Sequence, residues 1–207
     1  MKGRSFRVQN VRRNKGFTLV ELAIALVVIG IIVGAILKGA DLIDSARAKR
    51  LTESMKELET SVWIFYDKAR RMPGDCNRDG LIDYTLTSTQ PTFSNSTTAP
   101  TGYCTGTGNQ DSPFNDLKYA EIFSAGDPNA NLARHVFDGY FALGNFNGTN
   151  AIAIYNVPTW AARMVDASID GNENGLSGRV RRLDQSADWP TDKNAIVAMI
   201  YFISRTP

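Results

Sequence analysis

A single acidic side chain interrupts the longest apolar segment of this sequence. Residues 17–37 read FTLVELAIALVVIGIIVGAIL, in which Glu21 is the only charged residue. A carboxylate in a membrane helix costs about 2.5–3.5 kcal/mol on insertion scales, so it usually has a partner and a function. A cut after Gly16 would supply a cation, because the new amine of Phe17 would lie four residues before Glu21 on the same helix face. In an assembly, the amine of a neighbouring subunit could meet this carboxylate instead.

The same segment is long enough to cross a bilayer. As a helix, residues 17–37 span about 30 Å, the thickness of the hydrocarbon core. Residues 1–16 hold six basic residues and no acidic one, so the positive-inside rule places them in the cytoplasm and the rest of the chain outside. A conventional secretory signal would be shorter and would end in a small-residue cleavage site. A single-pass anchor with an uncleaved basic flank therefore stays open as an alternative.

Two glycines in the apolar segment could bring helices together. Gly30 and Gly34 form a GxxxG pattern, which allows close approach of two membrane helices. Chance is the alternative, since glycine is common in such helices.

Two acidic loops beyond the helix match the calcium-binding loop pattern in part. The first loop offers oxygens at positions 1, 3, 5 and 9, from Asp75, Asn77, Asp79 and Asp83. Its twelfth position, where the full pattern has Glu, is Leu86. The second and weaker match comprises Asp170, Asn172 and Asn174, with Asp166 as a carboxylate from outside the loop. The alternative is a set of Asx turns, in which these side chains bond to the local backbone.

The two cysteines lie on the outer side in this topology. That compartment is oxidising, so we expect a disulfide between Cys76 and Cys104. It would tether residues 85–113, a long surface loop rich in Ser, Thr, Pro and Gly, and would stabilise the fold by about 2–4 kcal/mol. Two free buried thiols are the alternative.

Composition excludes several functional classes. The chain has 207 residues and a net charge of +2, but its leader carries six of the 23 basic residues, so the remainder is slightly acidic. That balance excludes a basic nucleic-acid-binding body. One His and two Cys exclude a usual four-ligand zinc site, and no nucleophile-elbow pattern occurs. We therefore expect neither an enzyme nor direct nucleic-acid binding.

The spacing of apolar residues predicts a long helix followed by a globular part that contains both strands and a helix. An apolar stripe at helical spacing follows the membrane segment, at Leu51, Met55, Leu58, Val62, Phe65 and Ala69. Pro73-Gly74 should end this helix. Strands are expected at 135–143, 151–155 and 195–203, and a helix at 159–169. An antiparallel sheet packed on one long helix makes the fold class α+β.

The residues Lys15-Gly16-Phe17-Thr18-Leu19-Val20-Glu21-Leu22 resemble the class III signal of type IV pilins and pseudopilins. The resemblance implies that a prepilin peptidase cuts after Gly16 and methylates Phe17, and that Glu21 is the assembly glutamate. It also implies a cleaved leader at 1–16, a long helix at 17–72 and a globular head at 73–207.

The same resemblance implies a function. The chain would sit in the bacterial inner membrane with its head in the periplasm, surrounded by lipid, until an inner-membrane assembly platform adds it to a filament of pilins that can reach the cell surface. No cofactor is required, although some pseudopilins bind calcium in head loops. Lys38-Gly39 stands where many relatives have a Pro that kinks the helix, so the family kink is not implied here. Major pilins often carry a disulfide near the C-terminus, and no Cys follows Cys104, which favours a minor pilin or pseudopilin. The alternative is a membrane-anchored extracytoplasmic calcium- or glycan-binding module that does not polymerise.

Overall fold

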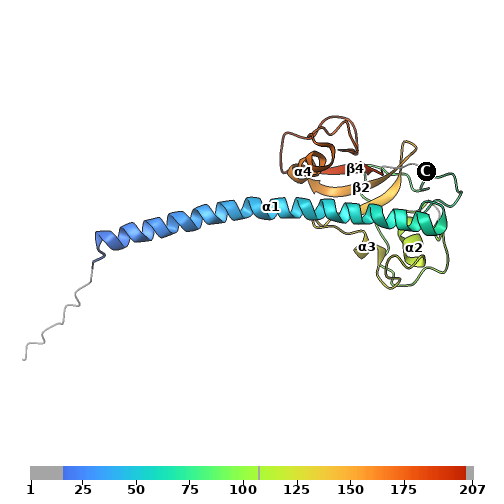
Figure 1. Ribbon diagram of the computed structural model, residues 1–207, viewed down its shortest axis with the longest axis horizontal. Helices are drawn as coiled ribbons and strands as arrows, with labels where there is room; N and C mark the ends of the chain where they lie inside the picture. Colours follow the sequence, from blue (N-terminus) through green and yellow to red (C-terminus); the bar gives the residue numbers. More distant parts are fainter. Residues whose placement is uncertain (1–15, 107, 204–207) are drawn as a thin grey trace, which may run out of the picture. The chain divides into compact units, whose positions relative to one another are not determined.

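The computed structural model describes residues 16–106 and 108–203, so most of the expected leader lies outside the described residues. The chain forms two compact units that meet between Leu42 and Ile43, and each is described by itself. The elements in chain order are α1 (Leu19–Ala69), α2 (Ser112–Tyr119), α3 (Asn129–Leu132), β1 (Phe141–Phe146), β2 (Thr149–Pro158), α4 (Thr159–Asp170), β3 (Val180–Arg182) and β4 (Ile196–Phe202) (Figure 1). A long N-terminal helix followed by an antiparallel sheet confirms the α+β class.

Helix α1 ends without a glycine. Its last residue is Ala69, and Arg70 follows with a left-handed φ of 55°. The Arg70 N–H donates to the Tyr66 carbonyl at 2.8 Å, which satisfies one of the carbonyls that a helix end exposes. The helix therefore stops four residues before Pro73, which cannot continue it.

The apolar stripe of α1 forms one wall of the head core. Five of its residues are at most 6% exposed, namely Leu51, Met55, Leu58, Val62 and Phe65. They belong to the same buried cluster as the central strands. In the view of Figure 1, β2, β4 and α4 lie on one side of this part of α1, and α2 and α3 on the other.

The sheet has the order β1-β2-β4-β3, and all neighbours are antiparallel. Strands β1 and β2 form a hairpin whose turn is Asn147-Gly148, with φ values of 51° and 77°. Positive φ at both positions is typical of a type I′ turn, which Asn-Gly favours. Strands β2 and β4 are the two inner strands, and β4 pairs with β2 on one side and, through Met199, Ile200 and Tyr201, with β3 on the other.

The first strand starts later than its composition suggests. We expected a strand from residue 135, but β1 begins at Phe141. Residues 135–139 form a tight turn, in which the Asp138 N–H donates to the His135 carbonyl at 3.0 Å. The His135 ring is buried and its Nε2 contacts the Tyr155 carbonyl at 2.8 Å, which anchors the turn to β2. Burial lowers the pKa of His135 to about 4, so the ring is neutral at pH 7.

Polar contacts tie α1 to the far edge of the sheet. Glu59, on α1, accepts a hydrogen bond from the Tyr201 hydroxyl at 2.5 Å and an ion pair from Arg179 at 3.1 Å. Arg179 also contacts the Tyr201 hydroxyl. Burial raises the pKa of Tyr201, so the hydroxyl remains a donor to the carboxylate.

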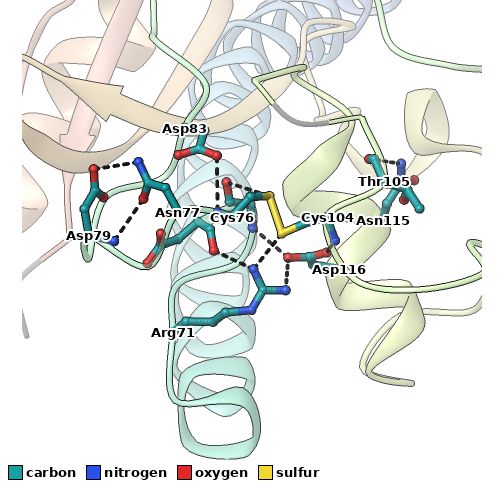
Figure 2. Close-up of a disulfide and its surroundings, with 11 residues drawn as sticks. Arg71, Cys76, Asn77, Asp79, Asp83, Cys104, Thr105, Asn115 and Asp116 are labelled. Carbon is teal, nitrogen blue, oxygen red and sulfur yellow. Dashed lines mark hydrogen bonds and ion pairs between the residues drawn. A yellow bond between two sulfur atoms is a disulfide. The ribbon is translucent and has the colours of Figure 1, made fainter.

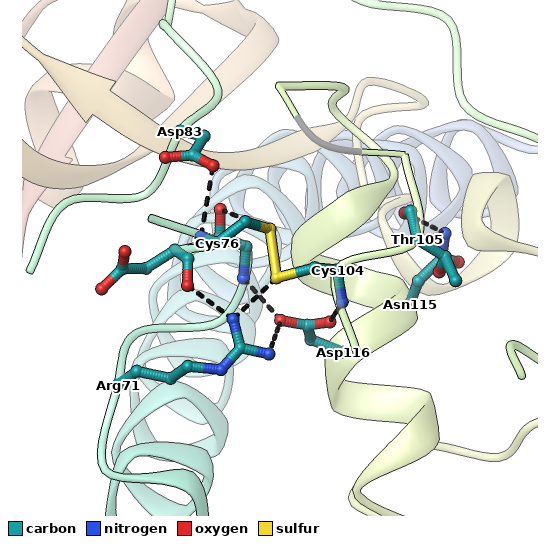
Figure 3. Close-up of polar contacts among 9 residues, drawn as sticks. Arg71, Cys76, Asp83, Cys104, Thr105, Asn115 and Asp116 are labelled. Carbon is teal, nitrogen blue, oxygen red and sulfur yellow. Dashed lines mark hydrogen bonds and ion pairs between the residues drawn. A yellow bond between two sulfur atoms is a disulfide. The ribbon is translucent and has the colours of Figure 1, made fainter. Parts of the chain in front are cut away.

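A buried ion pair lies just beyond the C-terminus of α1. The Arg71 guanidinium and the Asp116 carboxylate are 3.0 Å apart, with side chains 7% and 0% exposed (Figure 3). Asp116 also accepts hydrogen bonds from the N–H groups of Gly74 and Cys104, at 2.9 and 2.6 Å. A buried carboxylate is tolerated only when it is paired and hydrogen-bonded in this way.

The predicted disulfide is confirmed beside this ion pair. Cys76 and Cys104 are bonded, with Cα atoms 5.6 Å apart (Figure 2). Arg71 donates to the Asp75 carbonyl at 2.5 Å and contacts the Cys104 sulfur at 2.8 Å. The disulfide, the ion pair and the end of α1 therefore form one connected cluster.

We predict that Arg71→Met destabilises the head by about 3–5 kcal/mol, because it leaves the buried Asp116 carboxylate without its cation. Urea unfolding of the full chain in detergent, followed by tryptophan fluorescence, measures the change. Asp184→Asn is the matched control, because it removes the more exposed pair of Arg182 and Asp184 and should cost less than about 1 kcal/mol. Equal losses for the two variants would contradict the prediction.

Candidate functional site

The peptide between Gly16 and Phe17 precedes the first helix. Helix α1 begins at Leu19, so this bond lies in non-helical backbone. Phe17 is 82% exposed, and a side-chain carbon placed on Gly16 would have nothing within 4 Å. A non-helical and uncovered peptide of this kind is accessible to a protease active site.

Glu21 begins the helix in a capping box with Thr18. The Thr18 N–H and hydroxyl donate to Glu21 Oε2 at 2.9 and 3.0 Å, and the Glu21 N–H donates back to the Thr18 hydroxyl at 3.2 Å. The reciprocal bonds satisfy two of the N–H groups that a helix start leaves open. They supply no positive charge, and Glu21 takes part in no salt bridge among the described residues.

The role of Thr18 was missed, although the sequence carries its signal. A Thr followed three residues later by Glu, before an apolar run, is the spacing of a capping box. We had considered Glu21 only as a charge that needs a partner. The structure adds that its carboxylate also fixes the first turn of the helix.

The first unit exposes a continuous apolar surface. Every large apolar residue from Phe17 to Ile36 is exposed, and the helix is long and apolar enough to cross a membrane. Gly30 and Gly34 have open space where a side chain would stand. Their backbone is therefore accessible to another helix, as close packing at a GxxxG pattern requires.

The first acidic loop forms Asx turns. The side chains of Asn77 and Asp79 each accept a hydrogen bond from the backbone N–H two residues later, at 2.9 and 2.8 Å. Asp75 Oδ2 accepts from the Gly80 N–H at 3.1 Å, and Asp83 accepts from the Cys76 N–H at 3.2 Å. Figure 2 shows Asn77 and Asp79 bonded to each other and Asp83 directed to Cys76. The loop is thus ordered by its own backbone.

One atom in this loop could still take a ligand. Asp75 is 1% exposed, and its Oδ1 oxygen has no hydrogen-bond partner in the part of the chain that the structure describes. Within residues 16–106 and 108–203, however, no three His, Cys, Asp or Glu side chains are grouped as a metal site. Calcium at this loop therefore stays a prediction.

The second loop is organised around Asp166. This carboxylate is fully buried, and its Oδ2 accepts from the Trp189 indole at 2.7 Å and from the Asn174 N–H at 2.8 Å. Burial raises the pKa of Asp166 to about 6, although the two hydrogen bonds by themselves lower it. Asp170 accepts from the Val180 N–H at 2.8 Å.

The remaining members of that loop are less engaged. Asn172 is exposed, whereas Asn174 accepts from the Leu176 N–H at 3.0 Å, again as an Asx turn. The structure therefore brings Asp166, Asp170 and Asn174 into one hydrogen-bonded region and leaves Asn172 at the surface.

Residues 11–37 match the family described as the prokaryotic N-terminal methylation motif. The chain therefore carries the N-terminal motif expected of a pilin-like protein. The match spans the exposed Gly16–Phe17 peptide, the capped Glu21 and most of the apolar surface. It confirms the predicted resemblance of this segment to a prepilin signal.

Comparison of whole structures adds one similar chain, the major type IV pilin PilA1 from Clostridium difficile. It is 9% identical, with a TM-score of 0.39, over 78% of this chain and 96% of that one. No curated protein matches the sequence significantly. The likeness to pilins therefore rests on the motif at residues 11–37.

We predict that the head folds without calcium, because each of the four side chains in the first loop already accepts an amide hydrogen bond. Thermal unfolding of the full chain in detergent should show a cooperative transition both with a chelator and with calcium. If calcium raises Tm, Asp79→Ala should abolish the rise and Asn172→Ala should not. Loss of the folded transition in chelator would contradict the prediction.

Proposed function

We propose that this protein is a pilin, minor pilin or pseudopilin that builds a filament through its N-terminal helix. A prepilin peptidase cuts the peptide after Gly16 and methylates the amine of Phe17. Before assembly, the apolar helix lies in the inner membrane with the head outside the cytoplasm. An assembly platform then moves the chain into a homo- or hetero-oligomeric filament of a pilus or type II secretion pseudopilus.

The observation that carries the proposal is a charge that hydrogen bonds do not neutralise. Glu21 is held by Thr18, which is neutral, and its Oε1 oxygen accepts no hydrogen bond from described residues. A carboxylate among apolar side chains is strongly disfavoured unless it meets a cation. The α-amine at Phe17 supplies that cation only after cleavage.

The apolar surface supports the same conclusion. Nothing in the described chain covers residues 17–36, so lipid or other helices must do so. In a bundle of parallel helices, the first residue of one subunit meets the first turn of the next. A contact between the Phe17 amine and the Glu21 of a neighbour would then set the axial position of each added subunit.

The proposal assigns no catalytic residue and no nucleic-acid site. Calcium is an optional ligand of the head and takes no part in the assembly step. A membrane-anchored module that does not polymerise does not require a carboxylate at position 21. An assembly role of Glu21 would therefore distinguish a filament subunit from such a module.

We predict that Glu21→Gln inserts in the membrane but is at least about tenfold under-represented in filaments, since an unpaired charge in the bundle costs more than about 1.4 kcal/mol. Gln can still form a capping box, so this variant removes the charge and keeps the cap. Mass-spectrometric counting of variant and wild-type subunits in the same sheared filaments gives the ratio.

Thr18→Val is the matched control. It removes the hydroxyl of the capping box and keeps the carboxylate, so it should enter filaments close to the wild-type ratio. Equal incorporation of Glu21→Gln and wild type would contradict the assembly role. Loss of incorporation in Thr18→Val alone would assign Glu21 a capping role only.

A further inference from the structure

A lysine amine is buried in the head beside a side-chain amide. Lys118, in the last turn of α2, is 3% exposed. Its Nζ donates to the Oδ1 of Asn129 at 3.3 Å, and Asn129, the first residue of α3, is 2% exposed. The carbonyl carbon of the amide, which is an electrophile, is bonded directly to that oxygen.

The amine has no close counter-charge. No salt bridge of the described residues includes Lys118. Burial lowers the pKa of the Lys118 amine, although the charges of Asp127 and Asp111 oppose the shift. A desolvated lysine loses its proton more readily and becomes a nucleophile.

A carboxylate stands on the other side of the same amide. The Asn129 Nδ2 donates to Asp111 Oδ1 and to Asn115 Oδ1, both at 2.9 Å. Asp111 is 8% exposed and is held in place by the Ser94 N–H at 3.0 Å. Asp111, Asn115 and Lys118 are spaced four and three residues apart, so they share one face at α2.

The surroundings are apolar and aromatic. Phe114 lies one turn before Lys118 and is fully buried, and its ring packs against Phe93 at 5.3 Å between centroids. Charge interactions are stronger and a neutral amine is favoured in such an environment. An amine, an amide and a carboxylate are therefore placed together where less than a tenth of each residue is exposed.

We propose that Lys118 and Asn129 form an intramolecular isopeptide bond. The neutral amine of Lys118 attacks the Cγ of Asn129 and forms the new C–N bond. One proton of the attacking nitrogen passes to Nδ2, and Asp111, which accepts a hydrogen bond from Nδ2 at 2.9 Å, stabilises the positive charge that forms on that nitrogen. The bond from Cγ to Nδ2 breaks and ammonia leaves, so no oxidant, reductant or co-reactant is needed.

The bond would connect α2 to α3 across 11 residues of sequence. It would restrict the unfolded chain in the way that a disulfide does, but reducing agents would not break it.

The mass of the full chain purified in detergent tests the proposal. After reduction of the disulfide, the linked chain is lighter by one ammonia. Trypsin cuts after Lys and Arg, and Lys118 is the only such residue between Arg78 and Arg134, so a linked chain yields an uncut peptide 79–134. A second digestion that cuts at Tyr119 and Phe123 should leave the Lys118 and Asn129 fragments joined.

Variants test which side chains form the bond. Asn129→Ala and Asp111→Ala should carry the full mass and be cut after Lys118, whereas Lys68→Met should keep the link, because the Lys68 amine contacts only a main-chain carbonyl at 3.0 Å. The wild-type result does not depend on the folding of any variant. A wild-type chain of unmodified mass that trypsin cuts after Lys118 would overturn the proposal.

Discussion

The apolar surface of residues 17–36 is the constraint on which the rest of the molecule depends. No part of the described chain covers it, and water cannot solvate it favourably. This surface is therefore suited to contact with lipid or with other helices. In lipid and in a helix bundle alike, Glu21 is the only charged side chain of residues 17–37, so it marks one axial position on an otherwise uniform apolar helix. Its capping box with Thr18 satisfies hydrogen bonds and leaves the charge to be matched.

The head packs along the C-terminal half of α1. Apolar packing of the stripe provides the bulk of the contact, and Glu59 fixes it laterally to Arg179 and Tyr201. Beyond the helix end, the Arg71–Asp116 pair and the disulfide connect the chain to α2. A subunit whose helix is pulled or packed by neighbours would transmit that load to the head through these contacts.

Much of the fold could be predicted because its signals are local. The spacing of Leu51, Met55 and Leu58 indicates a helix face, and Asn147-Gly148 between two apolar runs indicates a hairpin. Strand β4 lies almost where its apolar run predicts, at Ile196–Phe202. The methylation motif is likewise local, since it lies within residues 11–37.

The parts that could not be predicted depend on distant partners. Helix α2 follows a polar loop and carries only a short apolar face, so its sequence is not distinguishable from a surface turn. Asp116 is buried because Arg71, 45 residues earlier, reaches it, and no local pattern records that pairing. The same holds for Lys118 and Asn129, which become reactive neighbours only through the fold. Thr18 is different, because its spacing to Glu21 was readable and was overlooked.

The most direct test of the account is the N-terminus of the protein isolated from the membranes of its own cells. Top-down mass spectrometry of the intact chain gives its first residue and any modification on it. The account predicts a chain that begins at Phe17 with a methylated amine. A chain that still carries residues 1–16, with an unmodified Gly16–Phe17 peptide, would contradict it, because Glu21 would then lack the cation that assembly requires.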